Sequence, residues 1–231
     1  TPDSDSTDTT DNTSTSAKAL KAGNEVNISV GEFKIDSADD SVYSNGNIVI
    51  TGGNISVAAG DNGMHADGNL TISDGTVDIT KSYEGIEGSI VTIDGGTISV
   101  VASDDGINCA GGSDTGSTDR MGADQFSSQD GVELNINGGT VTVDADGDGL
   151  DSNGNFTMAG GTVCVCGPTN GGNGALDYNG TANVTGGTLI ACGAVGMEEG
   201  FSDTSTQYSV LHDLGSTVSA NEKLTITDSD D

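Results

Sequence analysis

Hydrophobic and polar residues alternate along this chain in short runs that recur at a nearly constant distance. Residues 97–100 and 140–143 each alternate polar and apolar side chains directly after a pair of glycines. Alternation of this kind is the period of a β-strand with one buried face. No segment carries a sustained helical period with capping residues, so the sequence predicts an all-β protein with almost no helix.

A Gly-Gly-(Thr/Asn)-apolar motif marks an internal repeat of about 22 residues. Successive motifs are 22, 21, 43, 22 and 26 residues apart, and the step of 43 contains one repeat plus a polar insertion at residues 111–131. A second short strand closes each repeat, and an Asn-Gly or Asp-Gly turn lies between the strands. We expect these turn glycines to supply positive φ angles. The motifs begin at Gly52, Asp74, Gly95, Gly138, Gly160 and Gly186.

A 22-residue unit of short strands has the size of one turn of a parallel β-helix. The alternative, a β-sandwich, predicts irregular spacing and hairpin signals instead. We therefore predict a single parallel β-helix (solenoid) of about 8–9 coils over residues 25–227, with the insertion 111–131 as a loop. Residues 1–24, rich in Ser, Thr and Asp, are expected to be a disordered acidic tether. Tethers of this kind often follow an export signal or lipid anchor, which suggests an extracellular or cell-surface location.

Composition supports a fold whose core needs few large residues, and charge excludes several partners. The chain has 37 Gly, no Trp, and 36 Asp and Glu against six Lys and Arg, for a formal net charge of −30. A nucleic-acid-binding protein needs a basic surface, so that class is excluded. The same charge argues against attachment to an anionic membrane surface, and no apolar run is long enough to insert into one.

Alignment of the repeats places acids and amides at matching positions around one inward apolar residue per repeat. They recur three and two residues before that residue and one residue after it. In a β-helix such positions stack about 5 Å apart, where carboxylates repel one another. The aligned segments are 39–43, 61–65, 83–87, 104–108 and 147–151, continued by Leu176-Asp177.

The stacked acids predict cation sites between coils, because a cation offsets the repulsion. Oxygen ligands from carboxylates and amides favour Ca²⁺, and we expect two or three ions. The alternative is a stack of turns that collects Asp and Asn without any metal. The first expected site uses Glu84, Glu87, Asp104, Asp105 and Asn108. The second uses Asp105 and Asn108 with Asp146, Asp148, Asp151 and Asp177.

Residues 137–154, Gly167-Pro168 and residues 173–180 and 185–191 resemble a clostridial family of secreted carbohydrate-binding domain proteins. The resemblance extends over about residues 26–227. It implies a right-handed β-helix with bound calcium, similar to polysaccharide lyases. It also implies a protein that binds cellulose-like and acidic pectic polysaccharides of the plant cell wall, such as polygalacturonate, at the cell surface.

The same resemblance suggests which residues hold calcium. Calcium-dependent lyases of this type use an Asp-Asp-x-x-Asp cluster together with an acid from the preceding coil. Asp104, Asp105 and Asn108 occupy the cluster positions here, and Glu84 occupies that of the preceding acid. Asn108 replaces the last Asp, so the charge of the site differs from that of the lyases.

Three functions remain open. A polysaccharide-binding protein without catalysis fits best, with Ca²⁺ bridging protein and sugar carboxylates, because a chain of charge −30 repels a polyanion by itself. The second is β-elimination of the pectate lyase type, in which Lys81, three residues before Glu84, is the one credible base. Lys81 is better explained as a charge that screens the acids. The third is a structural spacer stiffened by calcium, which would retain no glycan.

Few side chains outside the core are suited to contact a sugar. Tyr43 and Tyr83 lie on or near the acidic positions and are candidates for stacking, although each also suits a packed turn. Lys81 and, in the insertion, Arg120 are the candidate basic contacts.

The four cysteines offer a separate hypothesis. Cys166 and Cys192 each fall five residues after the second glycine of their repeat, so they are expected to be neighbours in adjacent coils. A disulfide between them is possible in an exported protein, and free thiols are an equal alternative. No His pair accompanies Cys164 and Cys166, which argues against a soft-metal site.

Overall fold

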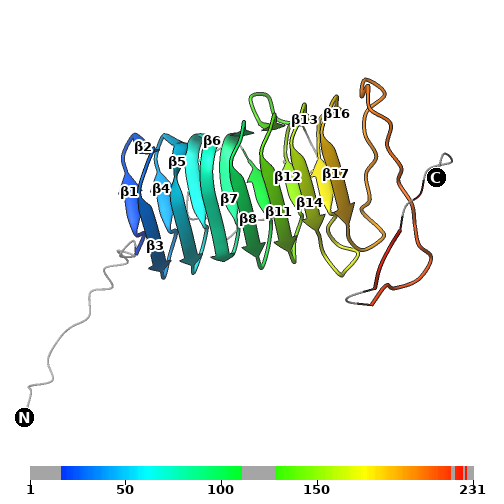
Figure 1. Ribbon diagram of the computed structural model, residues 1–231, viewed down its shortest axis with the longest axis horizontal. Coiled ribbons are helices and arrows are strands. Elements are labelled where there is room, and N and C mark those ends of the chain that lie inside the picture. The colour runs from blue at the N-terminus through cyan, green and yellow to red at the C-terminus, as the bar shows by residue number, and fades with distance from the viewer. Residues whose placement is uncertain (1–16, 111–127, 220–221, 226, 228–231) are drawn as a thin grey trace, which may run out of the picture.

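The computed structural model describes residues 17–110, 128–219, 222–225 and 227. The strands stack side by side along one long axis and form a solenoid, with β1 at one end and β17 at the other (Figure 1). All strand pairs are parallel, and no helix occurs in the described residues. The described part of the chain accordingly contains no helix that could span a membrane. The prediction of a parallel β-solenoid is confirmed.

Each coil contributes one extended segment to each of the three faces of the solenoid. Three long strands run through more than one face, namely β5 (Asn47–Ala59), β6 (Met64–Lys81) and β7 (Ile86–Ile93). The other strands of the first face are β1 (Leu20–Ala22), β4 (Val42–Ser44), β9 (Ile107–Cys109), β12 (Leu150–Ser152) and β15 (Leu176–Tyr178). Those of the second face are β2 (Glu25–Ile28), β10 (Glu133–Ile136), β13 (Asn155–Met158) and β16 (Ala182–Val184). Those of the third face are β3 (Glu32–Ser37), β8 (Thr97–Ala102), β11 (Thr140–Ala145), β14 (Thr162–Cys166) and β17 (Thr188–Cys192).

The first face contains seven strands in register, so the solenoid has seven coils, fewer than the eight or nine expected. Two segments account for the difference. The insertion before β10 takes up about one repeat length, with residues 111–127 outside the described part of the chain. The described residues after Cys192 form no strand, although the repeat was expected to continue to residue 227.

The solenoid also begins earlier than expected. Leu20 to Ala22 of β1 pair with β4, so residues 20–22 belong to the first coil rather than to the tether. The rest of the expected tether up to residue 16 lies outside the described residues.

The core is a stack of small and branched side chains, which explains why the fold needs few aromatic residues. Inward positions of successive coils contact one another because the strands pair in register. Met64, for example, pairs with Val42 on one side and Ile86 on the other, and all three are completely buried. Each coil buries its apolar residues against its neighbours, so the stack rather than the single coil is the stable unit.

Two kinds of glycine serve two different purposes. The second glycine of each Gly-Gly pair has a positive φ, as in Gly96 (φ 88°) and Gly139 (φ 80°), which L-residues rarely adopt. The glycines of the Asn-Gly turns were expected to do this, but they do not have positive φ. They are needed because the neighbouring coil lies so close: a Cβ on Gly46 would lie 1.9 Å from the Asn24 carbonyl oxygen, and one on Gly154 would lie 1.8 Å from that of Val132.

Candidate functional site

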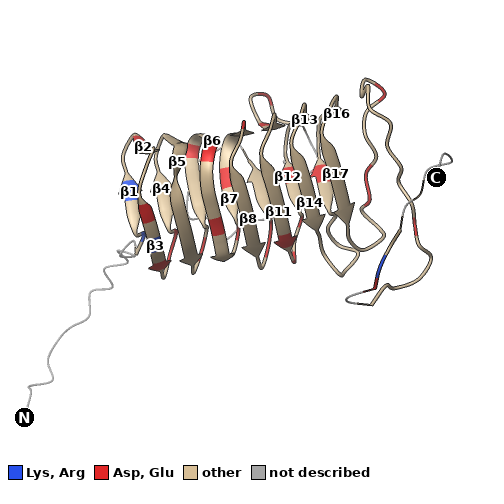
Figure 2. Cartoon of the chain, viewed as in Figure 1, with Lys and Arg blue, Asp and Glu red and all other residues tan. Residues whose placement is uncertain are grey.

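The expected alignment of acids and amides is confirmed by the strand register of the first face. The residue after each inward apolar residue pairs with its equivalent in the next coil, so Asn108 lies between Glu87 and Asp151. Acidic side chains recur on successive strands along the solenoid, whereas lysine marks the β1 end (Figure 2). We call this line of positions the first-face row: Lys21, Tyr43, His65, Glu87, Asn108, Asp151 and Asp177.

Three aspartates of adjacent coils bring their carboxylates together beside this row. One oxygen each of Asp105, Asp148 and Asp151 lies within 4.8 Å of the others. The Asp148 backbone N–H donates to Asp105 Oδ1 at 2.7 Å, and the Gly174 N–H donates to Asp148 Oδ1 at 2.5 Å. Backbone amides of the following coil therefore orient the side chains of Asp105 and Asp148. We call Asp105, Asp148 and Asp151 the carboxylate cluster.

Electrostatics show that the carboxylate cluster is costly as three free anions. Burial, with the negative charges of Asp104, Asp148 and Glu84, raises the pKa of Asp105 to about 8. Burial and neighbouring acids raise the pKa of Asp148 to about 6, and raise that of Asp151 well above its usual range. No described lysine or histidine forms an ion pair with any of the three.

Gly147 allows a fourth carboxylate, that of Asp104, to approach the cluster. A Cβ placed on Gly147 would lie 2.5 Å from Asp105 Oδ1 and 2.7 Å from Asp104 Oδ1. The two oxygens thus converge on the bare Cα of this residue, where any side chain would separate them. Glycine at this position keeps Asp104 beside the carboxylate cluster.

Asn108 contributes an oxygen that protein groups leave unused. Its Oδ1 is buried and accepts no hydrogen bond from any described residue. Such an acceptor is costly unless something electropositive contacts it. In the row, Asn108 is the direct neighbour of Asp151.

These observations fit a bound hard cation. The candidate ligands offer only oxygen atoms, and several of these oxygens are charged. Backbone N–H groups of the following coil hold the Asp105 and Asp148 carboxylates in place. A divalent cation between the coils would offset the repulsion that raises these pKa values. The residues that would hold it are Asp105, Asp148, Asp151 and Asn108, with Asp104 and the half-buried Asp177 at its edges.

Other residues of the two expected sites lie in different surroundings. Asp146 is exposed and is not part of the carboxylate cluster. Glu87 faces the other way along the row, where its Oε2 lies 3.2 Å from His65 Nδ1 and accepts a hydrogen bond from the Asn62 amide. Glu84 is half-buried, and its charge helps to raise the pKa of Asp105, which places it near the cluster.

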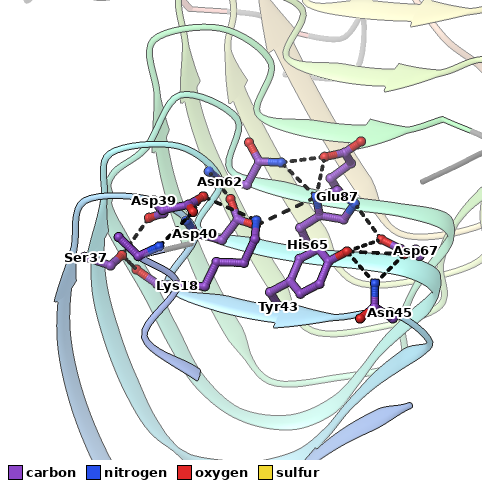
Figure 3. Close-up of polar contacts among 12 residues, drawn as sticks. Lys18, Ser37, Asp39, Asp40, Tyr43, Asn45, Asn62, His65, Asp67 and Glu87 are labelled. Carbon is purple, nitrogen blue, oxygen red and sulfur yellow. Dashed lines mark hydrogen bonds and ion pairs between the residues drawn. The ribbon is translucent and has the colours of Figure 1, made fainter. Parts of the chain in front are cut away.

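A second acidic group at the β1 end already has a cation, supplied by the chain (Figure 3). Oxygens of Asp39, Asp40 and Asp61 lie within 4.8 Å of one another. The Lys18 ammonium lies 3.3 Å from Asp39 Oδ1 and contacts Asp40, which is fully buried. Burial opposes both pKa shifts in this group. Contacts with Asp40, followed by those with Asp39, nevertheless raise the pKa of Lys18. Backbone N–H groups of Asp40 and Ala17, followed by Lys18, lower the pKa of Asp39.

Sequence alignment missed this lysine because residues 1–24 were assigned to the tether. Lys18 and Lys21 stand two residues before and one residue after Leu20, which are the positions that acids and amides hold in later coils. Extending the repeat by one unit toward the N-terminus would have found them.

The candidate sugar contacts are spread over the solenoid. Tyr43 is only 6% exposed; its ring lies 4.2 Å from Lys18 Nζ and packs edge-on against His65, and its hydroxyl donates to Asp67 Oδ1 at 3.0 Å (Figure 3). Its ring is therefore covered by protein. Tyr83 is half-buried in the turn before β7.

The two basic candidates give different results. Lys81 is exposed at the end of β6 and forms no ion pair or hydrogen bond with a described residue. No contact joins Lys81 to the carboxylate cluster within the described part of the chain. Arg120 lies outside the described residues.

Fold and site together define a parallel β-solenoid with a line of mainly acidic and amide side chains along one face. A family model described as "carbohydrate-binding domain-containing protein" matches residues 1–63 and 65–174. The chain belongs to this carbohydrate-binding domain family, which confirms the resemblance inferred from its motifs. No curated protein and no solved structure matches the chain.

Proposed function

We propose that this protein binds acidic plant cell-wall polysaccharides, such as polygalacturonate, through calcium held at the carboxylate cluster, without catalysing a reaction. Membership of a carbohydrate-binding family supports binding of a glycan in general. The observation that carries the calcium proposal is the convergence of Asp105, Asp148 and Asp151 without an ion pair from any described lysine or histidine.

Net charge supports a metal-mediated mode of binding. A chain of charge −30 repels a polyuronate, and the two lysines of the first coil lie at the far end of the row. Calcium bound to three carboxylates and an amide would use only part of its six to eight coordination positions. The remaining positions are available to sugar carboxylates and hydroxyls, so the ion would bridge protein and glycan.

A binding role fits the described basic residues better than β-elimination does. Elimination needs a base close to the metal-bound uronate. Lys81, the candidate base, has no contact with the described acids. The described carboxylate cluster supplies ligands, and no contact positions Lys81 beside them, so we propose capture of the polymer at the cell surface rather than cleavage.

The experiment is retention on immobilised polygalacturonate in Ca²⁺ and in EDTA. We expect strong retention in Ca²⁺ and loss in EDTA for the wild type, and loss in both conditions for Asp148→Asn. The matched control is Asp144→Asn, which removes the same charge from the exposed outer surface of β11 in the same coil. Retention that survives chelation, or equal losses in the two variants, would refute the calcium bridge.

A further inference from the structure

The end of the third face carries three cysteines in two neighbouring strands. Cys166, the last residue of β14, pairs in register with Cys192, the last residue of β17. Cys164 lies on the same outward side of β14 but pairs with Ile190. Cys109, the remaining cysteine, is completely buried elsewhere in the core.

The Cys166–Cys192 pair meets the Cα-spacing requirement of a disulfide. In-register neighbours in a parallel sheet place their Cα atoms about 5 Å apart and point their side chains to the same side, which falls within the disulfide range. The Gly167 N–H donates to the Cys192 carbonyl at 2.7 Å, so the two backbones stay together up to the ends of the strands. Burial and the neighbouring Cys166 thiol raise the pKa of Cys192, consistent with close sulfur atoms.

The strand that Cys192 terminates is exposed at the end of the solenoid. Residues 199–207 cover the ends of the first two faces, where the Ser202 N–H donates to the Ala182 carbonyl at 2.8 Å. On the third face, β17 pairs with β14 alone among the described strands. Ile190 is 58% exposed there. A terminal strand with one partner and little buried surface opens easily.

We propose that Cys166 and Cys192 form a redox site whose disulfide fastens the last strand of the solenoid to the preceding coil. A small disulfide of the glutathione type is the oxidant. One cysteine thiolate attacks it, forms a mixed disulfide and releases one glutathione thiolate; the other cysteine thiolate then attacks the protein sulfur and releases the second. Two protein thiols are oxidised while one glutathione disulfide is reduced to two thiols.

A soft-metal site at the same place is less consistent with the geometry. Such a site needs three or four ligands around one ion. Among the described residues, the three sulfurs do not come within the 4.8 Å that unites the acidic groups. Cys164 lacks a cysteine partner in register, so we assign it no part in the disulfide.

The test is oxidation of the full chain with glutathione disulfide, followed by alkylation and mass spectrometry of the intact protein and its peptides. We expect a loss of about two mass units and a Cys166–Cys192 peptide in the wild type and in Cys164→Ser. Neither should occur in Cys166→Ser. Oxidation should also slow amide exchange at Ile190 and Cys192, whose N–H groups face β14 in the parallel ladder, on the order of 100-fold.

Several results would overturn the proposal. They are a bond that involves Cys164, a disulfide-linked dimer, a persistent glutathione adduct, or thiols that stay reduced in the folded wild type. Unchanged exchange at Ile190 after the bond has formed would refute the fastening role while leaving the bond itself established. Reduced wild type is the reference throughout, so the comparison does not depend on how the serine variants fold.

Discussion

Replacement of Asp148 by Asn should change stability in opposite directions with and without calcium. In EDTA, the change removes one of three mutually repelling carboxylates while keeping an oxygen that accepts the Gly174 N–H. In Ca²⁺, the same change removes a charged ligand. A stack of turns that binds no metal would show neither the stabilisation by calcium nor its loss in the variant.

The size of the effect follows from the pKa of Asp148, which burial and neighbouring acids raise from 3.8 to about 6. A shift of about two units corresponds to about 3 kcal/mol of cost for the ionised form. Because Asp148 is only partly buried, solvent screening lowers this figure to ~2 kcal/mol. For a domain of this size that equals an increase in Tm of about 6 °C in EDTA at pH 8.

Thermal unfolding in EDTA and in millimolar Ca²⁺ measures both effects. Saturation of the wild-type site at 100 times its Kd adds about 2.7 kcal/mol, or about 8 °C. We expect Asp148→Asn to begin higher in EDTA and to gain little from Ca²⁺. Asp144→Asn should behave as the wild type does. A lower Tm for Asp148→Asn in EDTA together with an undiminished calcium gain would show that the carboxylate cluster is not the site.

Three further predictions address the same face. In EDTA, the free energy of unfolding should fall as pH rises from about 4 to about 8, because the folded protein holds the proton of Asp105 over this window and the unfolded chain does not. Urea titrations at several pH values measure this slope, and a flat or rising profile would contradict it. Lys18→Met should lower the free energy of unfolding by about 3 kcal/mol, because it leaves the buried Asp40 without its lysine partner. The control Lys21→Met, at an exposed position, should lower it by less than about 1 kcal/mol. Calcium should restore part of the stability of Lys18→Met alone. Gly147→Ala should cost about 2 kcal/mol and weaken calcium binding measured by calorimetry, because its Cβ would displace two carboxylates, whereas Gly23→Ala has open space and should change neither.

Repeat length and strand pattern sufficed to predict the architecture, because a parallel solenoid uses the same local rules in each coil. The alignment that placed Asn108 beside Asp151 is the register that the structure shows. Coil number was overestimated, because division of the length by 22 treats the insertion and the segment after Cys192 as coils. Neither segment carries a glycine pair followed by the polar–apolar alternation on which the prediction rests.

Site residues were harder to predict than the fold, because side-chain direction depends on neighbours in other coils. Glu87 and Asn108 hold equivalent positions, yet Glu87 faces His65 and Asn62, whereas Asn108 lies beside Asp151. Asp146 lies only two residues before Asp148 in the chain, yet it is exposed. The pattern of acids indicates which face holds the site, and only the three-dimensional contacts show which carboxylates converge.

Lys18 pairs with acids at the β1 end of the solenoid, whereas the carboxylate cluster toward the other end has no ion pair with a described lysine. The solenoid is therefore electrically asymmetric. The Lys18 ammonium is a counter-ion covalently attached to the chain, so dilution or chelation cannot remove it from Asp39 and Asp40. A cation at Asp105 and Asp148 would be exchangeable. Changes in its concentration would therefore alter the dipole moment along the rod as well as the total charge, and with it the orientation in which the molecule approaches a charged surface.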